Sequence, residues 1–283
     1  MIKKIWLKFI GMTLVVLLIN SCQPEDPPPS TPNILQSMTN DAYGAVAGVQ
    51  TAVYAIGPPT SLAHVICYAA WGTWTALSAS GTFNAQFHQW PNNYGSRMNI
   101  SLINDTASKL YDANNLQYAE LGKLHNDILH RWAINNPGVV FGNNATTKAF
   151  IRLNFSTSPY APLPCTEELN PSQNDSIADH LTELGANSPN YNLNSISDVA
   201  EQFNILAQQN QNLAAGILVI KPIVIEAWNL YLSGNYYNLV SYLHNEVNKV
   251  NNNFYNLDYE NLAVAISMIN ITTHSYHYWY YYY

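Results

Sequence analysis

Charged residues are scarce in this sequence of 283 residues. Asp, Glu, Lys and Arg make up only 10% of it, against about 25% in ordinary soluble domains. The 11 basic and 18 acidic residues give a formal net charge of −7. Because a nucleic-acid backbone is bound by clustered Lys and Arg side chains, we expect no nucleic-acid partner.

Catalytic and cofactor motifs are also missing. The stretch "GVVFGNNATTK" lacks the Gly-Lys-Ser/Thr ending of a phosphate-binding loop. The sequence contains no GxSxG motif, no CxxC motif and no run of spaced acids of the EF-hand type. We therefore predict no cofactor and no metal ion. A catalytic function stays open, and a non-catalytic one is favoured.

Apolar and neutral polar residues take the place of charge. Apolar residues form 48% of the chain, enough to bury a large core, and the length suits one large domain or two small ones. Asn occurs in runs such as "NNPGVVFGNN" and "KVNNNFYN", and the chain holds 20 Tyr. A neutral surface of this kind suits a glycan partner, although the codon usage of an AT-rich genome would produce the same bias.

Residues 1–21 have the pattern of a secretory signal. A short basic start precedes an apolar run over residues 10–19, which is short for a membrane span and typical of the apolar region of a signal. The stretch "LINSC" follows, with Leu18 four residues before Cys22 and Ser21 directly before it. It resembles the lipobox of bacterial lipoproteins. The resemblance implies that the signal is cleaved before Cys22 and that Cys22 carries acyl chains.

The residues after Cys22 bear on sorting. Gln23 in place of Asp argues against retention in an inner membrane, and "CQPED" resembles the export signal of Bacteroidetes-type surface lipoproteins through Glu25 and Asp26. The resemblance implies an outer-membrane protein that is anchored by lipid, with acyl chains such as palmitate, and exposed at the cell surface. Residues 22–32 also hold five prolines, which predict an extended tether.

A second apolar stretch runs from Leu213 to Leu232. Lys221 and Pro222 stand at its middle, and a central charge costs about 2.5–3.5 kcal/mol in a membrane helix. We therefore expect a buried helix that ends or kinks near Pro222. The N-terminal lipid is then the expected membrane anchor.

Two cysteines remain once Cys22 is lipidated, namely Cys67 and Cys165. Export places them in an oxidising compartment, where a disulfide can persist. Cys165 lies in the Pro-rich stretch "SPYAPLPCTEE" and Cys67 in an apolar segment. Their positions in the sequence do not decide the geometry, so Cys67 and Cys165 are a candidate disulfide and two free thiols are the alternative.

Residues 33–283 are expected to form a mainly α-helical, multi-helix globular bundle with few or no strands. Apolar residues recur at helical spacing, and short turns containing Gly and Asn separate the segments. The predicted helices are residues 33–56, 115–135, 175–185, 197–215, 218–232, 236–250 and 257–275. Residues 62–80 fit either a helix or a strand, and residues 137–173 are expected to be loop-rich.

The stretch "GKLHNDILHRW" at residues 122–132 invites a metal or catalytic hypothesis through His125, Asp127 and His130. At about 100° per residue, His125 falls inside the apolar arc of the helix, whereas the other two fall on its polar side. The three side chains cannot chelate one ion from one helix. We expect His125, beside Asn126, to be a hydrogen-bonded core histidine, with a catalytic role as the alternative. His130 is expected in solvent.

A second Leu-His-Asn occurs at His244 and is followed by Glu246. If the two helices pack together, His125, Asn126, His244 and Glu246 would form a polar cluster. His244 falls at the flank of the apolar arc of its helix, so the two histidines are not equivalent positions.

The sequence then reaches "HSYHYWYYYY" at residues 274–283. We expect a helix that docks its aromatic face on the core, with an exposed aromatic surface as the alternative. Together, "LGKLHNDIL" and "AISMINITTHSYHYW" resemble a Gly-x-x-His-Asn helix and a C-terminal aromatic helix of uncharacterised secreted Bacteroidetes proteins. The resemblance implies export and a helical architecture. It implies no activity, because these proteins have none assigned.

These patterns predict a lipid-anchored envelope protein that acts as a non-enzymatic binding or interaction module at the outer membrane or cell surface. Its partners would be the membrane, through the lipid, and a glycan or a protein. The alternative is an envelope or extracellular enzyme that uses a buried polar cluster around His125.

Overall fold

The computed structural model describes residues 31–87, 99–136, 146, 149–150, 153–154, 157–160, 193–252 and 256–282. Of these residues 87% are helical and none lies in a strand, so the predicted helical bundle is confirmed. The α-helices are α2 (Thr31–Ile56), α3 (Leu62–Phe87), α4 (Ile100–Ser108), α5 (Leu116–Asn135), α9 (Ile196–Gln209), α10 (Ala214–Leu232), α11 (Tyr236–Asn252) and α12 (Tyr259–Tyr282). Short 3-10 helices, η1 (Ala113–Asn115) and η2 (Gln211–Leu213), precede α5 and α10.

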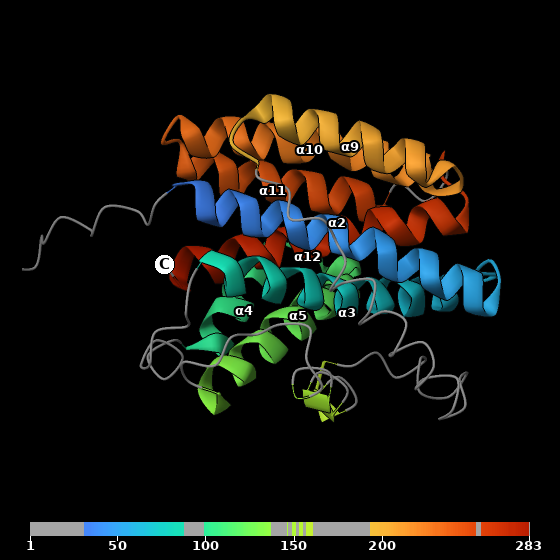
Figure 1. Cartoon of the computed structure of the whole chain (residues 1–283), viewed down its shortest axis with the longest axis horizontal. Coiled ribbons are helices and arrows are strands. Elements are labelled where there is room, and N and C mark those ends of the chain that lie inside the picture. Colours follow the sequence, from blue (N-terminus) through green and yellow to red (C-terminus); the bar gives the residue numbers. More distant parts are fainter. Residues whose placement is uncertain are drawn as a thin grey trace, which may run out of the picture.

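Helix α12 is the centre of the bundle. It contacts α2, α3, α4, α5, α10 and α11, and in Figure 1 it lies between α9, α10 and α11 on one side and α3, α4 and α5 on the other. Every residue from Asn261 to Trp279 is buried. A helix that is covered on all sides needs no polar stripe for solvent, which explains why the aromatic residues of α12 do not gather on a single docking face.

Close approach between helices depends on glycines at the crossing points. A Cβ atom at Gly48 in α2 would lie within 3.0 Å of the Trp71 carbonyl oxygen of α3. A Cβ atom at Gly72 in α3 would lie within 3.0 Å of Ser267 Oγ of α12. The absence of a side chain at these two positions lets the backbones of α2, α3 and α12 pack against one another.

A helix that ends or kinks near Pro222 was expected; α10 does not end there but continues to Leu232. Pro222 is exposed, so the carbonyl group that loses its amide partner lies on the solvent side of the helix. Residues Gln211–Leu232 are the one described stretch that is long and apolar enough to cross a membrane by length and composition, with a mean hydropathy of 1.6. The inner face of α10, including Ile217, Ile220 and Trp228, is buried in the bundle. The core helix of a globular protein is equally long and apolar, and it is buried in the same way.

The remaining boundaries differ from expectation at a few places. Helix α2 begins at Thr31, so Pro32 of the predicted tether stands in the first helical turn, where proline is tolerated. Residues 62–80, which fit either a helix or a strand, belong to α3. The helix expected at 175–185 and most of the loop-rich region 137–173 lie outside the described residues.

Candidate functional site

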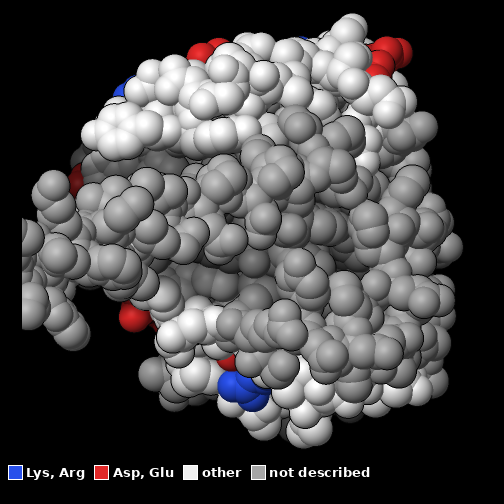
Figure 2. Space-filling model, turned by 90° about the vertical axis from the view of Figure 1, so that its left-hand side faces the viewer, with Lys and Arg blue, Asp and Glu red and all other residues white. Residues whose placement is uncertain are grey.

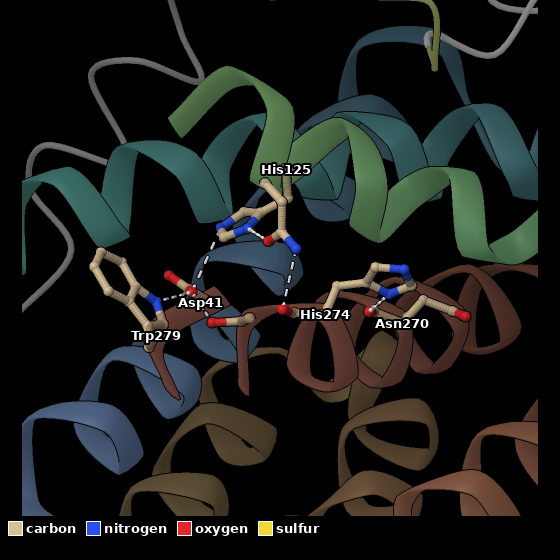
Figure 3. Close-up of polar contacts among 7 residues, drawn as sticks. Asp41, His125, Asn270, His274 and Trp279 are labelled. Atoms are coloured by element: carbon tan, nitrogen blue, oxygen red, sulfur yellow. Dashed lines mark hydrogen bonds and ion pairs between the residues drawn. The ribbon is translucent and has the colours of Figure 1, made fainter. Parts of the chain in front are cut away.

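Five side chains from three helices meet in the core and form what we call the buried polar cluster. Asp41 comes from α2, His125 and Asn126 from α5, and Ser275 and Trp279 from α12 (Figure 3). All five have an exposed fraction of 0%. Such burial of polar groups is tolerated only when they bond to one another.

Asp41 is the acceptor of the cluster. Its Oδ2 atom accepts hydrogen bonds from Ser275 Oγ and from Trp279 Nε1, the latter at 3.3 Å. His125 Nε2 lies 3.4 Å from the same oxygen, within the range of an ion pair. Asp41 Oδ2 is therefore the atom at which α2, α5 and α12 meet.

The orientation of Asn126 follows from its neighbours. Asn126 Nδ2 lies 3.1 Å from the carbonyl oxygen of His274, which can only accept, and 3.0 Å from Asn104 Oδ1. Asn126 Oδ1 must therefore face His125 Nδ1, at 3.2 Å. The other ring nitrogen of His125 faces Asp41, so the ring joins α5 to α2 in the core.

His274 of α12 is buried beside this pair. Burial lowers the pKa of His274 to about 3, with the charges of His277, Lys123 and His125 acting in the same direction. His274 Nδ1 lies 3.1 Å from the carbonyl oxygen of Asn270, so this nitrogen carries the proton and donates it. His274 is therefore a neutral ring at the α5–α12 interface.

Gly122 makes room for that ring. A Cβ atom at Gly122 would lie within 3.0 Å of three atoms of His274, including Cγ and Nδ1. Gly122, His125 and Asn126 are the three residues of the Gly-x-x-His-Asn pattern, and each of them faces a residue of α2 or α12. The two stretches that carry the family resemblance therefore pack against each other, and this pattern holds α5 to its neighbours.

His244 and Glu246 lie on α11 and are half-buried. Glu246 pairs with Lys249, and the His244 carbonyl oxygen accepts a hydrogen bond from Asn248 at 2.8 Å. Among the interactions that the structure gives for the described residues, none joins either residue to His125. The predicted set therefore divides into His125 with Asn126 in the core and His244 with Glu246 on α11.

His130 is buried, contrary to the expectation that it lies in solvent. Described residues at 150, 154 and 158 contact α5. Ser158 Oγ donates to Asp127 Oδ2 at 2.9 Å, and the ring of Phe150 packs edge-on against Trp132 at 5.0 Å. Burial lowers the pKa of His130, and the nearby Asp127 opposes that shift. The helical periodicity of α5 alone could not reveal this second covering segment.

Cys67 is buried and disulfide-bonded. The two other cysteines, Cys22 and Cys165, both lie outside the described residues, so the pairing of Cys67 with Cys165 stays a prediction. Gln23, Glu25 and Asp26 also lie outside them. In the described part of the chain no group of three His, Cys, Asp or Glu side chains could hold a metal ion.

Asp41, Ser275 and Trp279 are the cluster members that the sequence did not point to. One signal could have found Asp41, because it is the only charged residue between Thr31 and Ile56. A lone carboxylate inside a long apolar helix needs a partner if it is buried. Comparison with known proteins adds nothing to this picture, since no protein-family model, curated protein or solved structure matches the chain.

Proposed function

We propose that this chain is a lipid-anchored envelope protein whose helical body is a non-enzymatic binding or interaction module at the outer membrane, facing outward. The anchor rests on "LINSC" and on the acids and prolines that follow Cys22. Two or three acyl chains together hold a protein stably on a bilayer. The proline-rich residues 22–30 then connect that anchor to α2.

The observation that carries the non-enzymatic part is the sealing of the buried polar cluster. A general acid, general base or nucleophile must come within hydrogen-bond reach of a substrate. Asp41, His125 and Ser275 have no exposed surface, and each is bonded to a neighbouring helix. Their arrangement also lacks the nucleophile–base order of a catalytic triad, because Ser275 donates to the carboxylate and not to the imidazole. These groups serve to hold α2, α5 and α12 together.

The neutral surface supports a partner that is recognised without strong charge. Figure 2 shows one face on which a few charged side chains lie among described residues that are otherwise white. Among the residues that the structure describes, Tyr54 and Tyr237 are the most exposed large apolar ones, at 89% and 83%. Tyr offers a flat apolar ring with a polar tip, which suits contact with sugars or with a protein surface.

The anchor is tested by Cys22→Ala in the full-length protein. We expect loss of incorporation of a labelled palmitate analogue and release of the protein from the membrane fraction. Ser21→Ala is the matched control, since it keeps a small residue before the cysteine and should retain the label. Membrane association that survives Cys22→Ala would refute lipid anchoring.

Surface exposure is tested by replacing Glu25 and Asp26 with Ala. We expect reduced digestion of the protein by protease added to intact cells, with unchanged lipidation. Pro28→Ala serves as the control within the same tether. Equal digestion of the double variant and the wild type would mean that these acids are not an export signal.

The binding role is tested with the full chain that carries Cys22→Ala, titrated with neutral envelope polysaccharides and assayed in parallel for hydrolysis of the same material. We expect saturable binding without turnover. Turnover that is abolished by His125→Gln in a folded protein would instead establish the enzymatic alternative.

A further inference from the structure

Several helix ends meet at one end of the bundle, which we call the tether end. Helix α2 begins there at Thr31, α10 ends at Leu232 and α11 begins at Tyr236. One hydrogen bond joins the first half of α2 to the last part of α10, since Trp228 Nε1 donates to Thr39 Oγ1 at 3.0 Å. A second joins α2 to the residues before α9, since Gln36 Nε2 donates to the Leu193 carbonyl oxygen at 2.6 Å. Figure 1 places the start of α2 and the end of α12 on this same side.

The turn between α10 and α11 projects from the tether end. Gly234 has φ of 72°, which permits the reversal from α10 to α11. Leu232 is 52% exposed and Tyr237 is 83% exposed on either side of this turn. No Asp, Glu, Lys or Arg occurs between residues 227 and 245. The turn therefore presents two large apolar side chains without a neighbouring charge in the sequence.

A packed group of tyrosines supports this turn from behind. Tyr231 and Tyr236 pack edge-on at 5.2 Å between ring centroids, and Tyr276 and Tyr280 of α12 lie 5.9 Å apart. Tyr236 and Tyr280 join the two pairs at 6.3 Å. Packed rings of this kind hold the turn in place, so the exposure of its two apolar side chains belongs to a supported surface.

The tether limits how far this end can lie from the lipid. Residues 22–30 comprise nine residues, four of which are proline. At about 3.1 Å per residue in a polyproline conformation they span about 28 Å. The acyl chains on Cys22 lie in the bilayer, so the tether end is the end of the bundle nearest to it. Figure 2 views the molecule from this side.

We propose that the turn Leu232–Tyr237 is a membrane-contact site that inserts the side chains of Leu232 and Tyr237 into the interfacial layer of the bilayer that holds Cys22. The inference rests on the lipidation proposed above. Tyr is favoured at membrane interfaces because its ring is apolar and its hydroxyl group is polar. The contact is uncharged, so it does not depend on anionic lipid or on low salt. It fixes the orientation of the bundle on the membrane.

The test uses the full lipidated protein in vesicles of phosphatidylethanolamine and phosphatidylglycerol, with the mass of the N-terminal peptide measured first. A fluorophore is attached at Tyr237→Cys, and in a matched control at Tyr54→Cys in the last turn of α2, the end of that helix far from the tether end. The protein without an added cysteine gives the background from native thiols. We expect nitroxide-labelled lipid to quench the label at 237 at least about twofold more than the label at 54, equally in low and high salt.

A second variant isolates the two apolar side chains. In this variant the fluorophore is attached at Asn235→Cys. The double substitution Leu232→Asp and Tyr237→Asp should lower quenching to the level of position 54. The conservative substitution Leu232→Phe should leave quenching high. Equal quenching at 237 and 54 in lipidated protein would overturn the contact site and leave lipidation intact. A missing lipid mass would overturn the anchor and the contact site together. Protection of position 237 from a soluble quencher without lipid quenching would assign the turn to a protein partner and overturn the proposal.

Discussion

Acid should weaken the fold because two histidines of α12 are buried in the neutral form. Burial lowers the pKa of His277 to about 4 and contributes most to lowering that of His274 to about 3. In the unfolded chain both pKa values return to about 6.5. The unfolded state therefore takes up protons below pH 6.5 while the folded state does not. Stability is complete above pH 6.5 and falls as the pH decreases toward the folded pKa values.

The size of this loss follows from the shift. Each histidine that protonates only on unfolding lowers the free energy of unfolding by about 1.4 kcal/mol per pH unit below 6.5. At pH 5 this amounts to about 2 kcal/mol for each ring, or about 4 kcal/mol for His274 and His277 together. A loss of that size is a large part of the 5–15 kcal/mol that typical domains have. The two exposed fractions, 0% and 5%, leave little solvent to reduce it.

Urea unfolding at pH 7 and pH 5, followed by circular dichroism, measures the difference. His277→Gln removes one of the two titrating rings, so its loss of stability between the two pH values should be smaller than that of the wild type by about 2 kcal/mol. Tyr276→Phe alters packing next to His277 without removing a histidine, and it should keep the wild-type pH dependence. Other titrating groups are common to these proteins and cancel. An identical pH dependence in His277→Gln and the wild type would refute the reasoning.

Three further predictions concern the core. Asp41→Asn weakens the acceptor that Ser275, Trp279 and His125 share and should cost about 1–3 kcal/mol in urea unfolding; a loss below about 0.5 kcal/mol would contradict the shared acceptor. Gly122→Ala should lower the free energy of unfolding by about 1–3 kcal/mol through overpacking. In a protein that already carries His274→Ala, the same substitution should cost less, because the ring that it meets is gone. Equal losses in the two backgrounds would argue against the close approach. Cys67→Ala should lower the free energy of unfolding by about 2–5 kcal/mol when no reductant is present. Dithiothreitol should lower the urea midpoint of the wild type to that of the variant. A wild-type midpoint that does not change with reductant would argue against a stabilising disulfide.

The helices with a strong apolar repeat could be predicted from the sequence. The ranges 236–250 and 257–275 correspond to α11 and α12, because their apolar residues recur at helical spacing. Helix α4 was not predicted, since nine residues with three buried positions carry too little periodicity. The choice between helix and strand for α3 also stayed open, because its many small residues are buried on several sides and leave no clear stripe.

The candidate site was predictable only in part. Periodicity places His125 on the buried side of α5, and the structure buries it completely. Its partner in the core, Asp41, stands 84 positions earlier, and no periodic pattern connects residues of different helices. Which helices face each other depends on close approaches such as that of Gly122 to His274, and these come from packing of the whole bundle.

The central position of α12 also constrains when the protein can fold. Helices α2, α3, α4 and α5 all pack against α12, although they precede it by more than a hundred residues. Until residues 259–282 have been synthesised, the faces that those helices turn toward α12 have nothing to cover them, although α2 and α3 already pack against each other. Contacts between such distant segments slow folding and prolong the exposure of apolar surface. The core of the bundle can therefore be completed only late, after the other helices have been made.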